Sequence, residues 1–361
     1  MRIAFVLAGL GAGGAERVVS LLASELVKRG HDISIIAFDA ADAPVYHALD
    51  TRVRLIRLAV PPARGIGGIG AAVRRLLALR RTLRRVKPDM AIAFLSKINV
   101  LTLIAATGLR TAVIVSERNN FARQGAHPLW RALQWLFYRR ADRIIMQTEA
   151  SVQALPVALR QRAIVIPNPV MVQRRPDSFA RHNMLVAVGR LTHQKGFDIL
   201  IDAFARLAPA HPDWRLMIWG KGPDETLLRA RVAALGMEDV ILLPGLSATT
   251  ASWLDQATAF VLPSRYEGFP NALGEAMASG LPVVAFNCAF GPAEMIAHGE
   301  NGLLIDDGDV AALADALDCL MRDDALRARL GAAARADAGR FALDRIMVQW
   351  EALLPPPAAA E

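Results

Sequence analysis

The feature that most constrains the fold of this chain is a repeated alternation of short apolar runs with helical patterns. Uninterrupted apolar runs of this length are typical of strands buried on both faces, as in a parallel sheet covered by helices on each side. The first set of runs lies at 3–8, 33–38, 90–95, 111–116 and 143–148, with helices expected at 15–28, 70–87 and 128–140. A second set lies at 185–189, 215–220, 240–245, 259–264 and 282–286.

A polar, proline-containing stretch at 168–183 interrupts this alternation and is the natural linker between two domains. A chain of 361 residues is long enough for two hydrophobic cores. We therefore expect an α/β protein with two doubly wound, Rossmann-like domains, residues 1–168 and 184–340, facing each other across a cleft. Ligands of such sheets bind at the carboxyl ends of the strands. The tail at 355–361 is expected to be disordered.

The two halves of the chain carry opposite charge. Residues 1–181 hold 28 Lys and Arg against 11 Asp and Glu, whereas residues 182–361 hold 14 against 23. The basic half predicts an anionic partner. Nothing resembles a nucleic-acid-binding module, so an anionic membrane surface is favoured and nucleic acid is not expected. Two cysteines, Cys288 and Cys319, indicate neither a disulfide framework nor a metal cluster and fit a reducing cytoplasm.

The helix expected at 71–87 contributes most of the basic excess. Helical spacing places its apolar residues on one stripe and three arginines on another. The apolar stripe is Val73, Leu76, Leu79, Leu83 and Val86, and the basic stripe is Arg74, Arg81 and Arg85. Two interpretations remain open: an ordinary solvated helix face, or a basic surface that meets anionic lipid or a lipid-linked diphosphate. No segment is long and apolar enough to be a transmembrane helix.

A glycine-rich loop follows the first apolar run. Gly9, Gly11 and Gly14 match the dinucleotide fingerprint, and Asp39 closes the second run as a ribose-binding acid would. This is the argument for an NAD-dependent dehydrogenase. Alternatively, Gly13 and Gly14 let backbone amides approach a diphosphate. Glu16 lies in the first helical turn, where an acid either stabilises the helix end or contacts a ligand.

Residues 260–285, FVLPSRYEGFPNALGEAMASGLPVVA, place two acids beside a helix start. Glu267 is expected on a loop, because Gly268 and Pro270 interrupt the segment, and Glu275 in the first turns of the next helix. Loop amides and a helix N-terminus attract phosphate. Two carboxylates beside them suit a ligand with hydroxyls on both sides of a diphosphate, which describes a nucleotide sugar.

Two cations follow the first apolar run of the second half. Arg190, after Gly189, and Lys195, before Gly196, are placed to neutralise a departing diphosphate without a metal. Asp307 and Asp309 form an Asp-x-Asp pattern that suggests a metal site. Their position between a strand-like run and a helix makes Asp309 a helix N-cap instead. No metal or other cofactor is expected.

The chain resembles the retaining GT-B glycosyltransferases of family 4. The resemblance covers nearly the whole sequence and includes the E-x7-E segment. It is carried by GLGAGGAERV, VAVGRLTHQKGFDILIDAF, GKGP, CAFGPAEMIAHGENGLLI and RFALDRIMVQWEALL. SERNN (116–120), QTE (147–149) and NCAFGPAEMI (287–296) are similar to transferases that extend undecaprenyl-diphosphate-linked glycans, such as N-acetylgalactosaminyltransferases.

The resemblance implies a metal-independent transfer of a hexose or N-acetylhexosamine from a nucleotide sugar, with UDP as the expected nucleotide, to a lipid-diphosphate-linked saccharide. The first domain would bind the acceptor, the second the donor, and a helix at 341–354 would cross back to the first domain. Arg190, Lys195 and Glu267 are the expected catalytic residues. The expected donor-binding residues are Gly13, Gly14, Glu16, Arg118, Gly189, Gly245, Gly268, Phe269, Pro270, Asn271, Ala272 and Glu275. The enzyme would act at the inner face of the cytoplasmic membrane.

One departure from the family pattern concerns SERNN. Arg118 stands where many members carry a histidine, and Asn119 and Asn120 follow without the usual proline. Arginine stabilises anionic charge but cannot act as a general base at physiological pH. His127 is expected on the surface. The alternatives are a nucleotide-sugar epimerase of the same fold, an NAD-dependent dehydrogenase and a catalytically silent binding protein.

Overall fold

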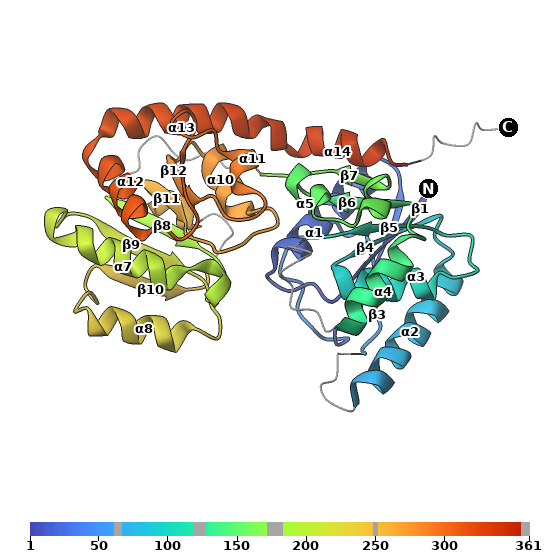
Figure 1. Ribbon diagram of the computed structural model, residues 1–361. Coiled ribbons are helices and arrows are strands. Elements are labelled where there is room, and N and C mark those ends of the chain that lie inside the picture. Colours follow the sequence, from blue (N-terminus) through green and yellow to red (C-terminus); the bar gives the residue numbers. More distant parts are fainter. Residues whose placement is uncertain (61–66, 119–127, 172–182, 248–251, 355–361) are drawn as a thin grey trace. The chain divides into compact units, whose positions relative to one another are not determined.

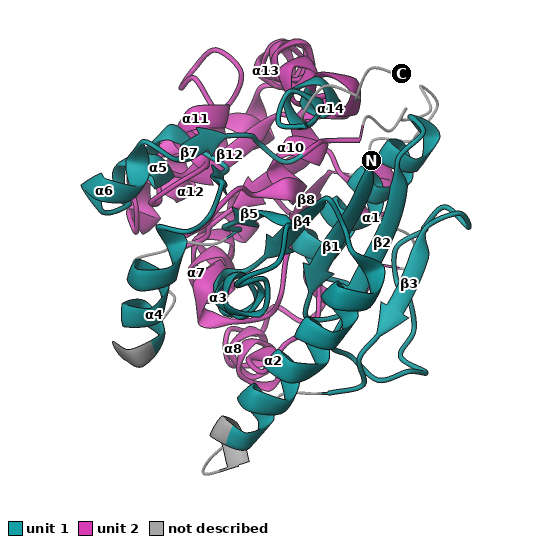
Figure 2. Cartoon of the chain, turned by 90° about the vertical axis from the view of Figure 1, so that its right-hand side faces the viewer, with its two compact units in different colours: residues 1–168, 346–361 teal, residues 169–345 magenta. Residues whose placement is uncertain are grey.

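The computed structural model describes residues 1–60, 67–118, 128–171, 183–247 and 252–354 (Figure 1). The chain divides into two compact units, and each is described by itself. Unit 1 comprises Met1–Asn168 together with Ile346–Glu361, and unit 2 comprises Pro169–Arg345 (Figure 2).

Unit 1 is built on a seven-stranded parallel sheet in the order β3-β2-β1-β4-β5-β6-β7. Its strands are β1 (Arg2–Leu7), β2 (Asp32–Ala37), β3 (Arg54–Arg57), β4 (Met90–Phe94), β5 (Ala112–Ser116), β6 (Arg143–Met146) and β7 (Ala163–Val165). Ile3 pairs with Ile33 on one side and with Met90 on the other. The strand order therefore reverses between β1 and β4, which makes their carboxyl ends the switch point of this sheet.

The helices of unit 1 cover this sheet on both faces. They are α1 (Gly14–Lys28), α2 (Gly67–Val86), α3 (Ser96–Ala105), α4 (Pro128–Tyr138), α5 (Glu149–Gln153) and α6 (Val157–Arg160). Leu79 of α2, Ile98 of α3 and Tyr138 of α4 belong to one buried cluster with the strand residues Ala4, Val6, Ala91 and Ala93. Helices α2, α3 and α4 thus share one face of the sheet, and burial of apolar area drives their packing.

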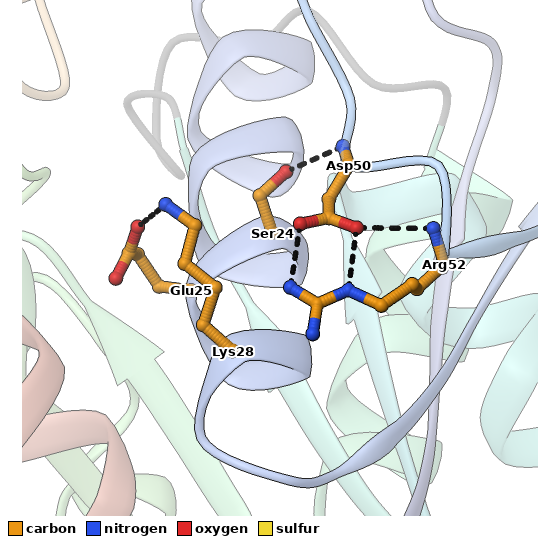
Figure 3. A network of polar contacts seen from close by, with 5 residues as sticks. All are labelled: Ser24, Glu25, Lys28, Asp50 and Arg52. Carbon is orange, nitrogen blue, oxygen red and sulfur yellow. Dashed lines mark hydrogen bonds and ion pairs between the residues drawn. The ribbon is translucent and has the colours of Figure 1, made fainter.

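A polar network attaches the segment before β3 to α1 (Figure 3). Ser24 Oγ accepts a hydrogen bond of 3.0 Å from the Asp50 amide, and Asp50 Oδ2 pairs with Arg52 Nη2 at 2.8 Å. On the same helix, Lys28 Nζ lies 2.6 Å from Glu25 Oε1. These solvent-exposed pairs orient the loop but add little stability.

Unit 2 has a six-stranded parallel sheet in the order β10-β9-β8-β11-β12-β13. Its strands are β8 (Met184–Val188), β9 (Arg215–Trp219), β10 (Ile241–Gly245), β11 (Ala259–Leu262), β12 (Val283–Phe286) and β13 (Leu303–Ile305). Here the order reverses between β8 and β11, which pair through Ala259–Leu185 and Phe260–Val186. The carboxyl ends of β8 and β11 are consequently the switch point of unit 2.

The helices of unit 2 form two buried layers. One layer packs α7, α8 and α12, through Phe204, Val232 and Leu317, and the other packs α9, α10 and α13, through Trp253, Met277 and Ala334. The helical segments are η1 (His193–Lys195), α7 (Phe197–Leu207), η2 (Ala208–Ala210), α8 (Glu225–Ala234), α9 (Ser252–Gln256), α10 (Asn271–Ala278), α11 (Pro292–Met295), α12 (Val310–Arg322), α13 (Asp324–Ala338) and η3 (Gly339–Phe341).

The last helix, α14 (Leu343–Glu351), begins in unit 2 and ends in unit 1. Within unit 1, Trp350 is buried and its ring stacks on Phe94 with centroids 6.4 Å apart. Within unit 2, the Val170 amide donates to the Phe341 carbonyl at 2.8 Å. The part of this segment that belongs to each unit is therefore packed or hydrogen-bonded within that unit.

The expected strands and helices are confirmed, with differences mainly at their ends. The runs at 143–148 and 259–264 leave the sheet after Met146 and Leu262, so their last residues belong to loops. The short edge strands β3 and β7 were not expected, because four and three residues carry little periodicity. One part of the apolar stripe on α2 is wrong: Leu79 and Leu83 are buried, but Val73 is 49% exposed.

Candidate functional site

The candidate site lies at the switch point of unit 2. The loop after β8 carries Lys195 and the loop after β11 carries Glu267. Lys195 Nζ lies 2.6 Å from Glu267 Oε1, with side-chain exposures of 20% and 6%. Residues 72 positions apart in the chain thus form an ion pair that stays partly accessible at the lysine. Such a pair holds a cation in a fixed place, available to an anionic ligand.

Glu267 is buried and makes hydrogen bonds besides the ion pair with Lys195. Its Oε1 also accepts a hydrogen bond of 2.6 Å from Ser264 Oγ, and its amide donates to the Ala289 carbonyl at 3.3 Å. Burial, together with the nearby Glu267 and Asp307 carboxylates, raises the pKa of the Cys288 thiol to about 12. Cys288 is therefore a neutral thiol at physiological pH and not a nucleophile.

Glycines allow the backbone to approach Lys195 closely. A Cβ placed on Gly189 would lie 3.2 Å from three carbons of the Lys195 side chain. Gly196 has φ +65°, and a Cβ there would lie 2.0 Å from the Pro263 carbonyl oxygen. Only glycine tolerates both this conformation and this distance. The loops after β8 and β11 are thus in direct contact.

A second ion pair, which the sequence did not reveal, joins the loop after β11 to the first turn of α7. Arg265 Nη1 and Nη2 donate to Asp198 Oδ1 and Oδ2 at 2.9 and 2.6 Å, and Nη1 also donates to the His193 carbonyl at 2.6 Å. Partial burial acts to raise the pKa of Asp198, but the Arg265 hydrogen bonds and charge outweigh it and lower that pKa. Gln194 Nε2 donates to the Tyr266 carbonyl at 2.9 Å. Arg265 and Asp198 flank the residues of the predicted motifs, which is the signal that could have found them.

The other predicted donor-binding residues of unit 2 lie at the same edge of the sheet. Glu275 is buried on α10, which begins at Asn271 after the segment Gly268–Pro270, and Ala272 follows on its first turn. Phe269 is also buried, and its ring packs edge-to-face on Phe341 with the ring centroids 5.3 Å apart. Arg190 has an exposed side chain. Gly245 ends β10, where its carbonyl accepts from the Gly220 amide at 2.8 Å.

In unit 1 the glycine loop is the start of α1. Gly13 is the N-cap and Gly14 the first helical residue, and the Glu16 carboxylate folds over Gly13 so closely that a Cβ there would lie 2.1 Å from Oε2. His47, which the sequence did not single out, has Nε2 3.3 Å from the Gly13 carbonyl oxygen. Burial is the main cause that lowers the pKa of His47.

Asp39 follows the end of β2, as the dinucleotide fingerprint requires, but its Oδ2 is engaged within unit 1. Its Oδ2 accepts from the Leu10 amide at 3.2 Å and pairs with Arg57 Nη1 at 2.8 Å. The carboxylate is therefore engaged with the glycine loop itself and with β3, whereas a ribose-binding acid presents its oxygens to the ligand. The local geometry weighs against the dehydrogenase alternative.

At the carboxyl end of β5 lies a buried charged network that the sequence did not reveal as such. Glu117 is 1% exposed and accepts from Ser96 Oγ at 2.8 Å and from Tyr138 Oη, while Asn99 Nδ2 donates to Tyr138 Oη at 2.9 Å. Burial raises the pKa of Glu117 and raises that of Tyr138. A charged residue directly after a buried strand is the sequence signal for this network.

Arg118 lies beside this network, within unit 1. It is buried, its Nη1 donates to Asn168 Oδ1, and its guanidinium lies 4.6 Å from the Phe94 ring centroid and 5.8 Å from that of Trp350. Burial lowers the pKa of Arg118 to about 9, so it remains a cation at neutral pH. Among the described residues, none accepts a hydrogen bond from its Nε or Nη2.

The remaining predicted residues are distributed elsewhere. Arg74, Arg81 and Arg85 are exposed on α2. Asn119, Asn120 and His127 lie outside the described residues. The expected N-cap at Asp309 is confirmed, since its Oδ1 accepts from the Ala312 amide at 2.9 Å.

In the parts of the chain that the structure describes, no three His, Cys, Asp or Glu side chains cluster as metal ligands. Within the same ranges, no helix combines the length and the apolar character that a bilayer span requires.

Comparison with known proteins relates both halves of the chain to sugar transferases. Residues 173–337 match the family described as Glycosyl transferases group 1, and residues 12–174 match Glycosyltransferase Family 4. A Campylobacter jejuni protein named GalNAc-alpha-(1->4)-GalNAc-alpha-(1->3)-diNAcBac-PP-undecaprenol alpha-1,4-N-acetyl-D-galactosaminyltransferase is 27% identical over 358 residues, covering 98% of each chain.

Two further comparisons differ in coverage. A Streptomyces coelicolor protein named exopolysaccharide phosphotransferase is 40% identical over 216 residues, which are 59% of this chain but only 23% of that longer protein. The crystal structure of Anabaena HepE in complex with UDP-glucose superposes with a TM-score of 0.79 at 21% identity, covering 98% of this chain and 100% of that chain. At this identity the structural similarity concerns the fold.

Proposed function

Because the chain belongs to the group 1 glycosyl transferases, with a family 4 first half and the GT-B fold, we propose a specific reaction for it. It is a retaining, metal-independent transferase that moves a hexose or N-acetylhexosamine from a nucleotide sugar, with UDP as the nucleotide. The acceptor is a growing lipid-diphosphate-linked glycan in cell-surface polysaccharide or glycan assembly.

The observation that carries this proposal is the Lys195–Glu267 ion pair at the switch point of unit 2. A sugar–diphosphate bond breaks with negative charge developing on the phosphate oxygens. Lys195, held by a buried carboxylate and against Gly189, is a preorganised cation for that charge. Arg190, exposed on the same loop, is free to turn toward the same phosphates. Two such cations do the work that a metal ion does in other transferases.

The two acids of the motif bind opposite ends of the donor. Glu275, on α10, accepts from the ribose hydroxyls, and Glu267 accepts from hydroxyls of the transferred sugar. The backbone N–H groups of Gly268, Phe269, Asn271 and Ala272 line the far side of the sugar; Pro270 has none. Gly245 lies at the same edge of the sheet. Unit 1 binds the acceptor and contacts the donor through Gly13, Gly14, Glu16 and Arg118.

The reaction itself needs no protein nucleophile. The bond between the anomeric carbon and the diphosphate oxygen breaks, the acceptor hydroxyl oxygen bonds to that carbon on the same face, and the hydroxyl proton passes to the departing diphosphate. The configuration is thereby retained. Neutral Cys288 beside Glu267 takes no part. Positioning and charge stabilisation supply the rate enhancement.

The names of similar proteins support the proposed classes of acceptor and donor. The Campylobacter relative is named for an undecaprenol-diphosphate-linked glycan, and HepE was crystallised with UDP-glucose. In this chain, the exposed Arg74, Arg81 and Arg85 provide a surface for the anionic membrane that carries such an acceptor. Peripheral association with the inner face of the cytoplasmic membrane is part of the proposal.

The test is a screen of the purified protein against nucleotide sugars, with and without lipid-diphosphate saccharides, in the presence of EDTA. We expect UDP release that depends on the acceptor and a product whose anomeric configuration, read by NMR, matches the donor. A strict requirement for Mg²⁺ or Mn²⁺ would contradict the metal-free account. Conversion of the nucleotide sugar without any acceptor would instead favour the epimerase alternative.

A further inference from the structure

Helix α4 presents an outward face of unusual composition. Trp135 is 46% exposed and Leu136 is 53% exposed, although both are large apolar side chains. Arginines lie on either side of them along the helix: Arg131 one turn before, and Arg139 and Arg140 just after α4. The Arg139 guanidinium lies 3.7 Å from the Trp135 ring centroid. The face therefore combines an apolar centre with a cationic border.

Helix α2 presents a similar face on the same side of unit 1. Val73 and Leu77 are 49% and 45% exposed, among the exposed arginines Arg74, Arg81 and Arg85. Both helices pack on α3 and share its buried cluster on one face of the sheet (Figures 1 and 2). Because the inner sides of α2 and α4 contact the sheet layer, their outer sides both face away from it.

The chemistry of this surface selects its partner. Neither 67–87 nor 128–141 contains an aspartate or glutamate, so the surface repels cations and attracts anions. A nucleic acid would match the charge but would leave the aliphatic Val73, Leu77 and Leu136 without a partner. An anionic bilayer satisfies both, because arginines contact lipid phosphates while aromatic and aliphatic side chains enter the boundary below the headgroups.

We infer that the outward faces of α2 and α4 form one membrane-docking surface, in which Trp135 and Leu136 insert into the bilayer interface and the arginines bind anionic headgroups. The inference rests on the proposed membrane-linked acceptor and adds to it an insertion step that basic residues alone do not supply. Electrostatic attraction decays over roughly 8 Å at physiological ionic strength, whereas inserted apolar area is insensitive to salt. Part of the binding therefore resists salt.

The experiment is co-sedimentation with phosphatidylcholine vesicles that contain phosphatidylglycerol, at low and high salt. Trp135→Ser/Leu136→Ser should lower partitioning about tenfold at both salt concentrations, because it removes inserted apolar area. Arg74→Glu/Arg81→Glu/Arg85→Glu should lower it strongly at low salt and little at high salt. The matched control is Leu227→Ser, since Leu227 is 66% exposed on α8 of unit 2 and should have no effect.

Fluorescence separates insertion from contact. The chain has six tryptophans, so the relevant signal is the part of the emission that Trp135 contributes. With brominated lipids in the vesicles that part should be quenched in the wild type, and Trp135→Phe should bind normally but lose that quenching, because phenylalanine retains the apolar volume without the fluorophore. Unquenched emission from bound wild-type protein would overturn the inference. Partitioning of the Trp135→Ser/Leu136→Ser variant equal to that of Leu227→Ser would also overturn it. So would a wild type that self-associates through this face, shown by sedimentation without lipid, if the double variant is a monomer.

Activity keeps this inference distinct from the proposed function. With a short-chain, water-soluble diphosphate acceptor, the double Ser variant should transfer sugar at the wild-type rate. With the same saccharide on a long-chain lipid in vesicles, it should be about tenfold slower. Vesicle binding and quenching without transfer to any acceptor would refute the proposed function and leave the docking surface standing. Transfer to both acceptors with no insertion would do the reverse.

Discussion

Both sheets place charged residues at the carboxyl ends of parallel strands, but the two units treat those charges differently. In unit 2, Lys195 pairs with Glu267 and remains partly accessible, and Arg190 is exposed. In unit 1, Glu117 and Arg118 are both almost completely buried. The Glu117 carboxylate is surrounded by Ser96, Asn99 and Tyr138, all belonging to the unit's own core.

The contrast shows that charged residues at strand ends can serve binding in one unit, at its switch point, and the packing of the core in the other, beside its switch point. A partly accessible cation with a buried counter-charge can bind an anion at small cost, since only one group must be desolvated further. A fully buried network loses more when any member is removed, because its partners are left unsatisfied. Substitutions in unit 2 should therefore change catalysis at constant stability, and substitutions at Glu117 should change stability first.

The largest effect is expected at Lys195. Lys195→Ala should lower kcat at least about 100-fold, because charge stabilisation that grows in the transition state is lost. The melting temperature should be nearly unchanged. Arg190→Ala should have an effect in the same direction. Lys28→Ala, which removes a lysine paired with Glu25 on α1, is the matched control and should retain full activity. A kcat within threefold of wild type for Lys195→Ala, roughly 0.7 kcal/mol, would remove the basis of the comparison.

The second effect concerns the buried network of unit 1. Glu117→Ala should destabilise unit 1 by about 2–4 kcal/mol, since it removes the buried carboxylate that accepts hydrogen bonds from Ser96 Oγ, Asn99 Nδ2 and Tyr138 Oη. The measurement is hydrogen-exchange protection of the β4, β5 and α3 amides, with unit 2 amides as the internal reference. If the variant keeps wild-type hydrogen-exchange protection but has lost sugar transfer, Glu117 takes part in the reaction and does not only stabilise unit 1.

A third prediction distinguishes the two acids of the motif within unit 2. Glu275→Ala should weaken UDP binding about 10- to 100-fold, because a charge-assisted hydrogen bond to ribose is lost. Glu267→Ala should leave UDP binding nearly intact, since it frees Lys195 for the diphosphate, and should instead impair use of the whole sugar donor. Isothermal titration with UDP and with the intact nucleotide sugar separates these outcomes. Equal loss of UDP binding in both variants would refute the division of roles.

A smaller effect is expected from the ion pair that joins the loop after β11 to the first turn of α7. Arg265→Ala should lower kcat about tenfold with little change in UDP affinity, because Lys195 and Glu267 lose positional restraint. Asp198→Ala should have a similar effect. The exchanged pair, Arg265→Asp with Asp198→Arg, should recover part of the rate. If each single variant has wild-type kcat, the Arg265–Asp198 ion pair does not position Lys195 and Glu267.

The smallest effect is a pH dependence of unit 1. Burial raises the pKa of Glu117, so the folded chain keeps that proton at pH values where the unfolded chain has released it. Stability therefore falls as the pH rises from the usual carboxyl value toward the raised one, and stays low above it. Hydrogen exchange of β5, corrected for intrinsic rates and compared between wild type and Glu117→Gln, tests this. The Gln variant should lack that decline, and an identical decline would assign it to another group.

Much of the fold followed from the sequence because buried parallel strands and their covering helices have distinct apolar periods. The runs at 3–8 and 185–189 lie within one residue of β1 and β8 at each end. Edge strands such as β3 gave no such pattern, since half-buried residues of an edge are chemically mixed. Helical periodicity places Val73 on the apolar side of α2. It does not show how far along the helix the neighbouring elements cover that side, and Val73 is exposed.

The sequence predicted which residues belong to the candidate site, but not which of them contact one another. Charged side chains beside glycines at strand ends were evident in the sequence, as were the Asp309 cap and the glycine loop before α1. The order of the apolar runs could not show that β8 and β11 are neighbours, because strand order depends on how the crossover helices pack.

By itself, the sequence determined the two parallel sheets, the family, the position of the acids and cations at strand ends, and the opposite charges of the two halves. Only the tertiary structure decided which of those charges meet. It brought Lys195 to Glu267 across 72 positions, attached Arg265 to Asp198, turned Asp39 toward Arg57 and enclosed Glu117 with Tyr138. Local pattern fixes the type of element and its buried side, but the partner of a polar group follows from strand order and burial, which are properties of the packed chain.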